Sequence, residues 1–95
     1  MADAEAQQRF EANLAVIRRY LTKHLPDYTV WEMSTRNRYY KFIVSNDETY
    51  KRHRLTVEWA RLSNRDCTPE TTQAALESGD VAKGMIQVVD DQYYW

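Results

Sequence analysis

The chain has 95 residues, of which 43% are hydrophobic and 13% aromatic, and its formal net charge is −1. This length predicts one domain over residues 1–95, and the apolar content excludes a disordered chain. No segment approaches the roughly 18 uninterrupted apolar residues of a membrane helix, and the N-terminal "MADAEAQQRF" is polar where a signal peptide is apolar. The single cysteine, Cys67, cannot form an internal disulfide, so we expect a cytoplasmic protein.

The near-neutral sum hides an uneven distribution of charge. Residues 18–65 carry eleven Lys and Arg against five Asp and Glu, whereas residues 66–95 carry one Lys against six acids. Such asymmetry is typical of a site for an anionic partner, and equally of two parts of one domain that attract each other.

Apolar residues recur at helical spacing near the N-terminus, at Phe10, Leu14, Ile17, Leu21 and Leu25. Pro26 follows, and proline disfavours helical geometry in the residue before it. The pattern therefore predicts a helix from Glu5 to His24.

The period then changes to two in "DYTVWEMSTR", "RYYKFIVS" and "KRHRLTVEWARL", which predicts three antiparallel strands joined by short polar turns. In the second hairpin, like charges directly opposite each other would destabilise the sheet. Pairing Phe42 with Leu55 avoids setting Lys41 against Arg54, and it leaves "DETY" as the loop. We therefore expect this register.

A second helix is predicted in "DCTPETTQAALESGD", with Thr68 as N-cap, Pro69 at the first helical position and a stop at Ser78-Gly79. Asp80 can cap one further turn in "VAKGM". The last ten residues, "IQVVDDQYYW", fit either a fourth strand or an ordered tail. For "DDQYYW" we favour packing on the domain itself over insertion into a partner.

Together these elements predict an α+β fold in which an N-terminal helix precedes a three-stranded antiparallel meander, a second helix and a C-terminal segment that can form a fourth strand. The helices cover one face of the sheet, because each element then buries its apolar side. The other face is left open, and we expect it to carry Tyr28, Val30, Glu32, Tyr39, Lys41, Ile43, Arg52, Arg54, Thr56 and Glu58.

The order helix, three strands, helix resembles the topology of double-stranded-RNA-binding domains. Such domains carry basic residues at the start of the second helix, whereas "TPETTQAALE" has Glu70 and Glu77 and no cation. The resemblance covers the arrangement alone, so no residue role follows from it.

Patterns that would indicate chemistry are absent from the sequence. His24, His53 and Cys67 show no metal-ligand spacing, and no serine lies in a GxSxG setting. We therefore expect a protein without enzymatic activity, cofactor or metal.

The sequence leaves two binding hypotheses. The first is a small regulatory or binding module that contacts a protein, or a second copy of itself, through the open face and the aromatic C-terminus. Its expected contact residues are Tyr39, Lys41, Ile43, Arg52, Arg54, Tyr93, Tyr94 and Trp95. The alternative is nucleic-acid binding through Arg36, Arg38, Lys41, Arg52 and Arg54.

Overall fold

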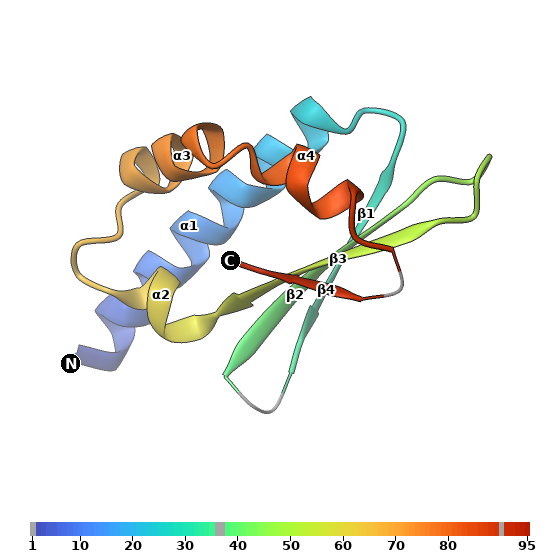
Figure 1. Ribbon diagram of the computed structural model, residues 1–95. Coiled ribbons are helices and arrows are strands. Elements are labelled where there is room, and N and C mark those ends of the chain that lie inside the picture. Colours follow the sequence, from blue (N-terminus) through green and yellow to red (C-terminus); the bar gives the residue numbers. More distant parts are fainter. Residues whose placement is uncertain (1, 36–37, 90) are drawn as a thin grey trace.

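The expected α+β fold is present in a computed structural model, which describes residues 2–35, 38–89 and 91–95 (Figure 1). In chain order the elements are α1 (Ala2–His24), β1 (Thr29–Ser34), β2 (Tyr39–Ser45), β3 (Arg52–Glu58), α2 (Trp59–Ser63), α3 (Pro69–Ser78), α4 (Val81–Ile86) and β4 (Gln92–Tyr94). The strands form one sheet in the order β1-β2-β3-β4. Figure 1 shows the helices gathered on one side of this sheet. None of the helices in the described ranges has the length and hydropathy that a membrane crossing needs.

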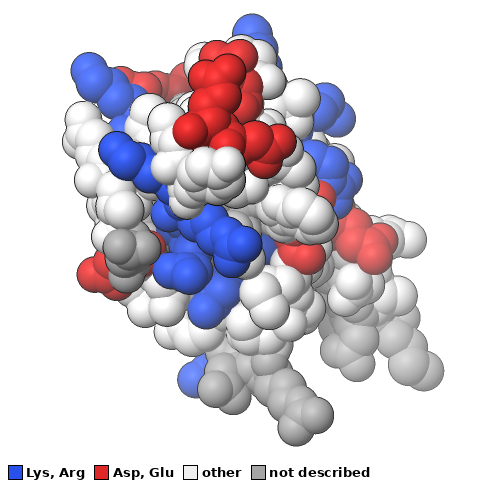
Figure 2. All heavy atoms as spheres, turned by 90° about the vertical axis from the view of Figure 1, so that its right-hand side faces the viewer, with Lys and Arg blue, Asp and Glu red and all other residues white. Residues whose placement is uncertain are grey.

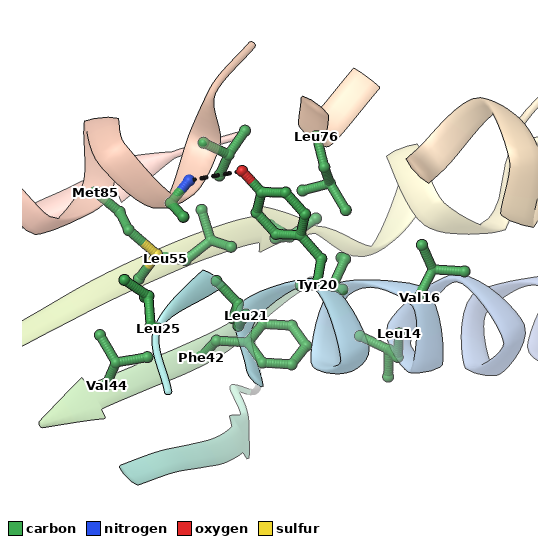
Figure 3. Close-up of a cluster of buried hydrophobic side chains, with 14 of the residues drawn as sticks. Leu14, Val16, Tyr20, Leu21, Leu25, Phe42, Val44, Leu55, Leu76 and Met85 are labelled. Atoms are coloured by element: carbon green, nitrogen blue, oxygen red, sulfur yellow. Dashed lines mark hydrogen bonds between the residues drawn. The ribbon is translucent and has the colours of Figure 1, made fainter. Parts of the chain in front are cut away.

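The predicted apolar stripe of α1 forms the centre of the core. Its five members, Phe10, Leu14, Ile17, Leu21 and Leu25, are all buried. Figure 3 shows Leu21 and Leu25 beside Phe42 and Val44 of β2 and Leu55 of β3. The hydroxyl of Tyr20, also on α1, accepts a hydrogen bond from the Ala82 N–H at 3.0 Å, and this bond ties α4 to the first helix.

The register expected for the second hairpin is confirmed. Phe42 lies opposite Leu55 and Tyr40 opposite Val57, so Lys41 lies opposite Thr56 and not opposite a cation. The ladder ends at Ser45 and Arg52, and one further backbone bond runs from the Asn46 N–H to the Lys51 carbonyl at 3.3 Å. The residues "DETY" form the tip of the loop, as expected.

A buried asparagine joins α1 to the segment after the meander. Asn13 donates from Nδ2 to the carbonyls of Leu62 (2.8 Å) and Cys67 (3.0 Å), and its Oδ1 accepts from the Thr72 hydroxyl at 2.9 Å. All three bonds lie in or beside the core. Removing the Asn13 side chain would therefore leave the two carbonyls and the Thr72 hydroxyl without these hydrogen-bond partners. Asn13 lies three residues after Phe10 and so falls on the apolar stripe, but helical spacing alone does not distinguish it from an exposed polar residue.

The third strand is shorter than its sequence pattern predicted. The segment "KRHRLTVEWARL" predicted a strand that includes Trp59, but the strand ends at Glu58 and Trp59 begins the short helix α2. This turn buries Leu62 completely. Trp59 stays 38% exposed, with its ring 5.8 Å from that of Phe10.

The helix after α2 begins as predicted. The Thr68 hydroxyl accepts from the Thr71 N–H at 3.1 Å, and the Thr71 hydroxyl accepts from the Thr68 N–H at 2.8 Å. This reciprocal pair is a capping box, with Pro69 at the first helical position.

The C-terminal segment forms a fourth strand, but it runs parallel to β3. Leu55 pairs with Tyr93 and Thr56 with Tyr94, and the Trp95 N–H donates to the Thr56 carbonyl at 2.9 Å. Parallel neighbours need a crossover connection, and the three helices between β3 and β4 supply it.

Candidate binding surface on the open sheet face

The side of the sheet that faces away from the helices combines aromatic, aliphatic and cationic side chains. We define the open face by residues that alternate away from the core on all four strands: Trp31, Met33, Tyr39, Lys41, Ile43, Arg52, Arg54, Thr56, Glu58, Gln92 and Tyr94. Four of its large apolar members are exposed, at 59% for Trp31, 48% for Met33, 39% for Tyr39 and 66% for Tyr94, while Ile43 is half-buried.

The first strand presents the opposite side from the one predicted. We expected Tyr28, Val30 and Glu32 on the open face, but Val30 lies opposite Val44 and Glu32 opposite Phe42, whose side chains face the helices. Opposed residues of an antiparallel pair share a face, so Val30 and Glu32 face the helices too. Tyr28 packs against the same core. Trp31 and Met33 therefore take the outward positions.

A salt bridge accounts for the inward position of the Glu32 carboxylate. Arg18 of α1 donates to both of its oxygens, from Nε at 2.5 Å and from a terminal nitrogen at 2.7 Å, and the Tyr40 hydroxyl donates to it at 2.9 Å. The hydrogen bonds from Arg18 hold the pKa of Glu32 below its usual range, against the opposing effect of burial. Burial, and then the bond to Glu32, raise the pKa of Tyr40. One acid is thereby removed from the open face.

The three C-terminal aromatics, which the sequence grouped as contact residues, lie in three different settings. Tyr94 projects on the open face, with its ring 6.5 Å from that of Tyr39. Tyr93 lies on the helix side, next to Gly84. A Cβ atom added at position 84 would lie 3.0 Å from the Tyr93 hydroxyl oxygen. Trp95 packs against the core, with the Arg61 guanidinium 4.0 Å from the centre of its ring. Only Tyr94 thus joins the predicted contact residues of β2 and β3.

A shallow hollow of about 240 Å³ lies between Tyr39 and Tyr94 on the open face. Lys41, Thr56 and Gln92 line it, together with Thr35. The Thr56 hydroxyl donates to Gln92 Oε1 at 2.6 Å, so the amide nitrogen is the part of Gln92 that is left for a ligand. Lys41 supplies an ammonium group, which can only donate. The hollow therefore favours a ligand group rich in hydrogen-bond acceptors, such as a carboxylate.

Cations lie along the same face. Lys41, Arg52 and Arg54 belong to it, while Glu58, opposite Tyr39 at the end of the ladder, is its one acid. Arg38 is exposed beside the β1–β2 connection, and Arg36 lies outside the described residues. Figure 2 shows Lys and Arg side chains gathered on the side of the molecule where the β2–β3 hairpin projects, next to a separate group of acids.

The residues considered as metal ligands lie apart. Within the described ranges, no three His, Cys, Asp or Glu side chains form a group that could hold a metal ion. His53 is buried, and its Nδ1 lies 2.9 Å from the Val88 carbonyl. The Cys67 sulfur lies 3.2 Å from the Thr72 hydroxyl. Both side chains thus make contacts within the fold.

No protein-family model matches the chain, and no curated protein or solved structure shows significant similarity to it. Any proposal of function for this chain therefore rests on its own residues.

The Arg18–Glu32 pair predicts a pH dependence of stability. Because the pKa of Glu32 is lower in the folded state, its contribution is fully present above the usual Glu pKa of about 4.3 and is lost as the pH falls through the folded value. Since the pair is partly exposed, Glu32→Gln should cost less than about 1 kcal/mol at pH 7. The difference from the unsubstituted protein should be smaller at pH 3 than at pH 7, because the carboxylate is increasingly protonated as the pH falls. Urea denaturation at both pH values measures it.

The matched control is Glu48→Gln, at an exposed position in the loop after β2. It should leave stability nearly unchanged at both pH values. A cost for Glu32→Gln that stays the same from pH 7 to pH 3 would contradict the account of this ion pair.

Proposed function

We propose that this protein is a non-enzymatic binding module of the cytoplasm that holds a partner protein on its open face. The observation that carries the proposal is the outward position of Trp31 and Met33 beside Ile43, Tyr39 and Tyr94. Solvated strands seldom present this much contiguous apolar surface without a partner. Trp, Tyr and Arg are also the residues that contribute most to the binding energy of interfaces.

The charges of the face define the chemistry of the partner. Lys41, Arg52 and Arg54 favour acidic groups, and the hollow between Tyr39 and Tyr94 favours an acceptor such as a carboxylate. Trp31 and Met33 favour apolar side chains. The partner surface that fits best therefore alternates acidic and apolar residues.

A displayed library of random peptides tests this proposal without knowledge of the natural partner. Selection on the protein should enrich peptides that combine Asp or Glu with apolar residues. Binding of a selected peptide, measured by fluorescence anisotropy, should weaken by about tenfold in Trp31→Ala and in Lys41→Glu, because each removes a contact worth roughly 1–2 kcal/mol.

The control variant Gln73→Ala changes a side chain on α3, away from the sheet, and should bind the peptide normally. Selected peptides that bind Trp31→Ala and Lys41→Glu as tightly as the unsubstituted protein would overturn the proposal.

A second candidate function is binding of single-stranded nucleic acid. The observation that favours it is the removal of Glu32 from the open face, which leaves Trp31, Tyr39 and Tyr94 interleaved with three cations. Aromatic rings can stack on bases while cations contact phosphates. Glu58 and the aliphatic Met33 and Ile43 fit this function less well, because they offer neither contact.

Charge reversal separates this candidate from the first. If the protein binds oligonucleotides, the affinity should fall between about 50 mM and about 200 mM salt, because phosphate contacts release counterions. Arg52→Glu with Arg54→Glu should abolish that binding while circular dichroism stays unchanged. The matched control reverses Arg65 and Lys83, two exposed cations away from the sheet. No binding of RNA or DNA at low salt would exclude this candidate.

A further inference from the structure

The open face changes from apolar to cationic between its first and third strands. Trp31 of β1 lies opposite Ile43 of β2, and Met33 follows two residues after Trp31 on the same side of the strand. Ile43 in turn lies opposite Arg54 of β3, and Arg52 precedes Arg54 by two residues. The three side chains on β1 and β2 thus form an apolar part, and the two arginines of β3 form a cationic part beside it.

The distance between β1 and β3 matches the width of a helix. Neighbouring strands lie about 4.8 Å apart, so these two strands are separated by about 10 Å. An α-helix with its side chains is about 10–12 Å across. A helix that lies along the strands above β2 can therefore direct one side towards Trp31 and Met33 and the adjacent side towards Arg52 and Arg54. An extended segment directs alternate side chains onto a single line, so it follows one part of the face and not both.

The spacing along each strand also matches a helix. Residues two apart in a strand are separated by about 6.6 Å. Residues four apart in a helix share one face and are separated along the axis by about 6 Å. Two acids four residues apart in a partner helix can therefore pair with Arg52 and Arg54, while two apolar residues four apart contact Trp31 and Met33.

The two arginines are available to such a partner. Arg52 is exposed and Arg54 is half-buried, and neither forms a salt bridge among the residues that the structure describes. The helices of the described chain all lie on the other side of the sheet (Figure 1). A helix on the open face would thus complete a three-layer arrangement, in which both faces of the sheet are covered.

We propose that the partner segment bound by the open face is an amphipathic α-helix with an acidic flank, which lies along the strands above β2. Its apolar stripe contacts Trp31, Met33 and Ile43, and two acids four residues apart pair with Arg52 and Arg54. This inference rests on the proposed function of the open face, and it adds the conformation of the partner and the spacing of its charges.

The test selects random peptides of about 20 residues on the full chain, a length sufficient for a helix to form on binding. A selected peptide should gain helical circular dichroism when it binds. Proline at a central position of the peptide should weaken binding by about tenfold or more, because proline removes a hydrogen bond inside a helix and clashes with the preceding turn. The matched control is alanine at the same position, which is chosen so that alanine leaves the affinity unchanged.

An exchange of charges tests the spacing of the acids. Arg52→Glu with Arg54→Glu should weaken the selected peptide by about tenfold or more, and changing two acids of the peptide that are four residues apart to lysine should restore the affinity. Reversal of Arg65 and Lys83 is the control, and it should leave binding of the original peptide unchanged.

The outcomes separate this inference from the proposed function. Selected peptides that lose affinity in Trp31→Ala and Lys41→Glu, but tolerate central proline and gain no helical signal, would overturn the helix and leave the proposed function intact. Peptides that bind those two variants normally, or a library from which no peptide is selected, would overturn both.

Discussion

The contact between Arg18 of α1 and Glu32 of β1 joins the first helix to the first strand, and it lies on the side of β1 that faces the helices. Because the side chains of a strand alternate, the position of Glu32 decides that of its neighbours. With the carboxylate and Val30 turned towards α1, Trp31 and Met33 must face solvent. The contribution of β1 to the open face depends on this orientation.

This contact is modest in energy but specific in geometry. A partly exposed ion pair contributes up to about 1 kcal/mol. The added bond from Tyr40, and the packing of Val30 against the core, act in the same direction.

The sequence predicted those elements whose signals are local. The stripe of α1, the N-cap at Thr68 and the register of the second hairpin followed from spacing, cap chemistry and opposed charges between neighbouring strands. The orientation of β1 did not follow, because Arg18, the residue that holds Glu32, lies fourteen positions away on another element. The parallel direction of β4 likewise depends on a crossover of three helices, which the pattern of "IQVVDDQYYW" cannot specify.

Only the part of the candidate site that depends on local alternation within a strand was predicted. Lys41, Ile43, Arg52 and Arg54 were placed on the open face from alternation within β2 and β3, and the structure places them there. Trp31 and Met33 were missed because their size marked them as core residues. Arg18 on the first helix, a cation able to pair with Glu32, was the signal that could have reversed that choice.

The orientation of β1 therefore supports the open face and the partner chemistry inferred from it. Lysine substitution at two adjacent positions tests it directly by urea denaturation. Trp31→Lys should change the free energy of unfolding by no more than about 0.5 kcal/mol, since the side chain is 59% exposed. Val30→Lys should cost about 1–3 kcal/mol, because it places a charge against the core. A larger cost for Trp31→Lys than for Val30→Lys would contradict the account.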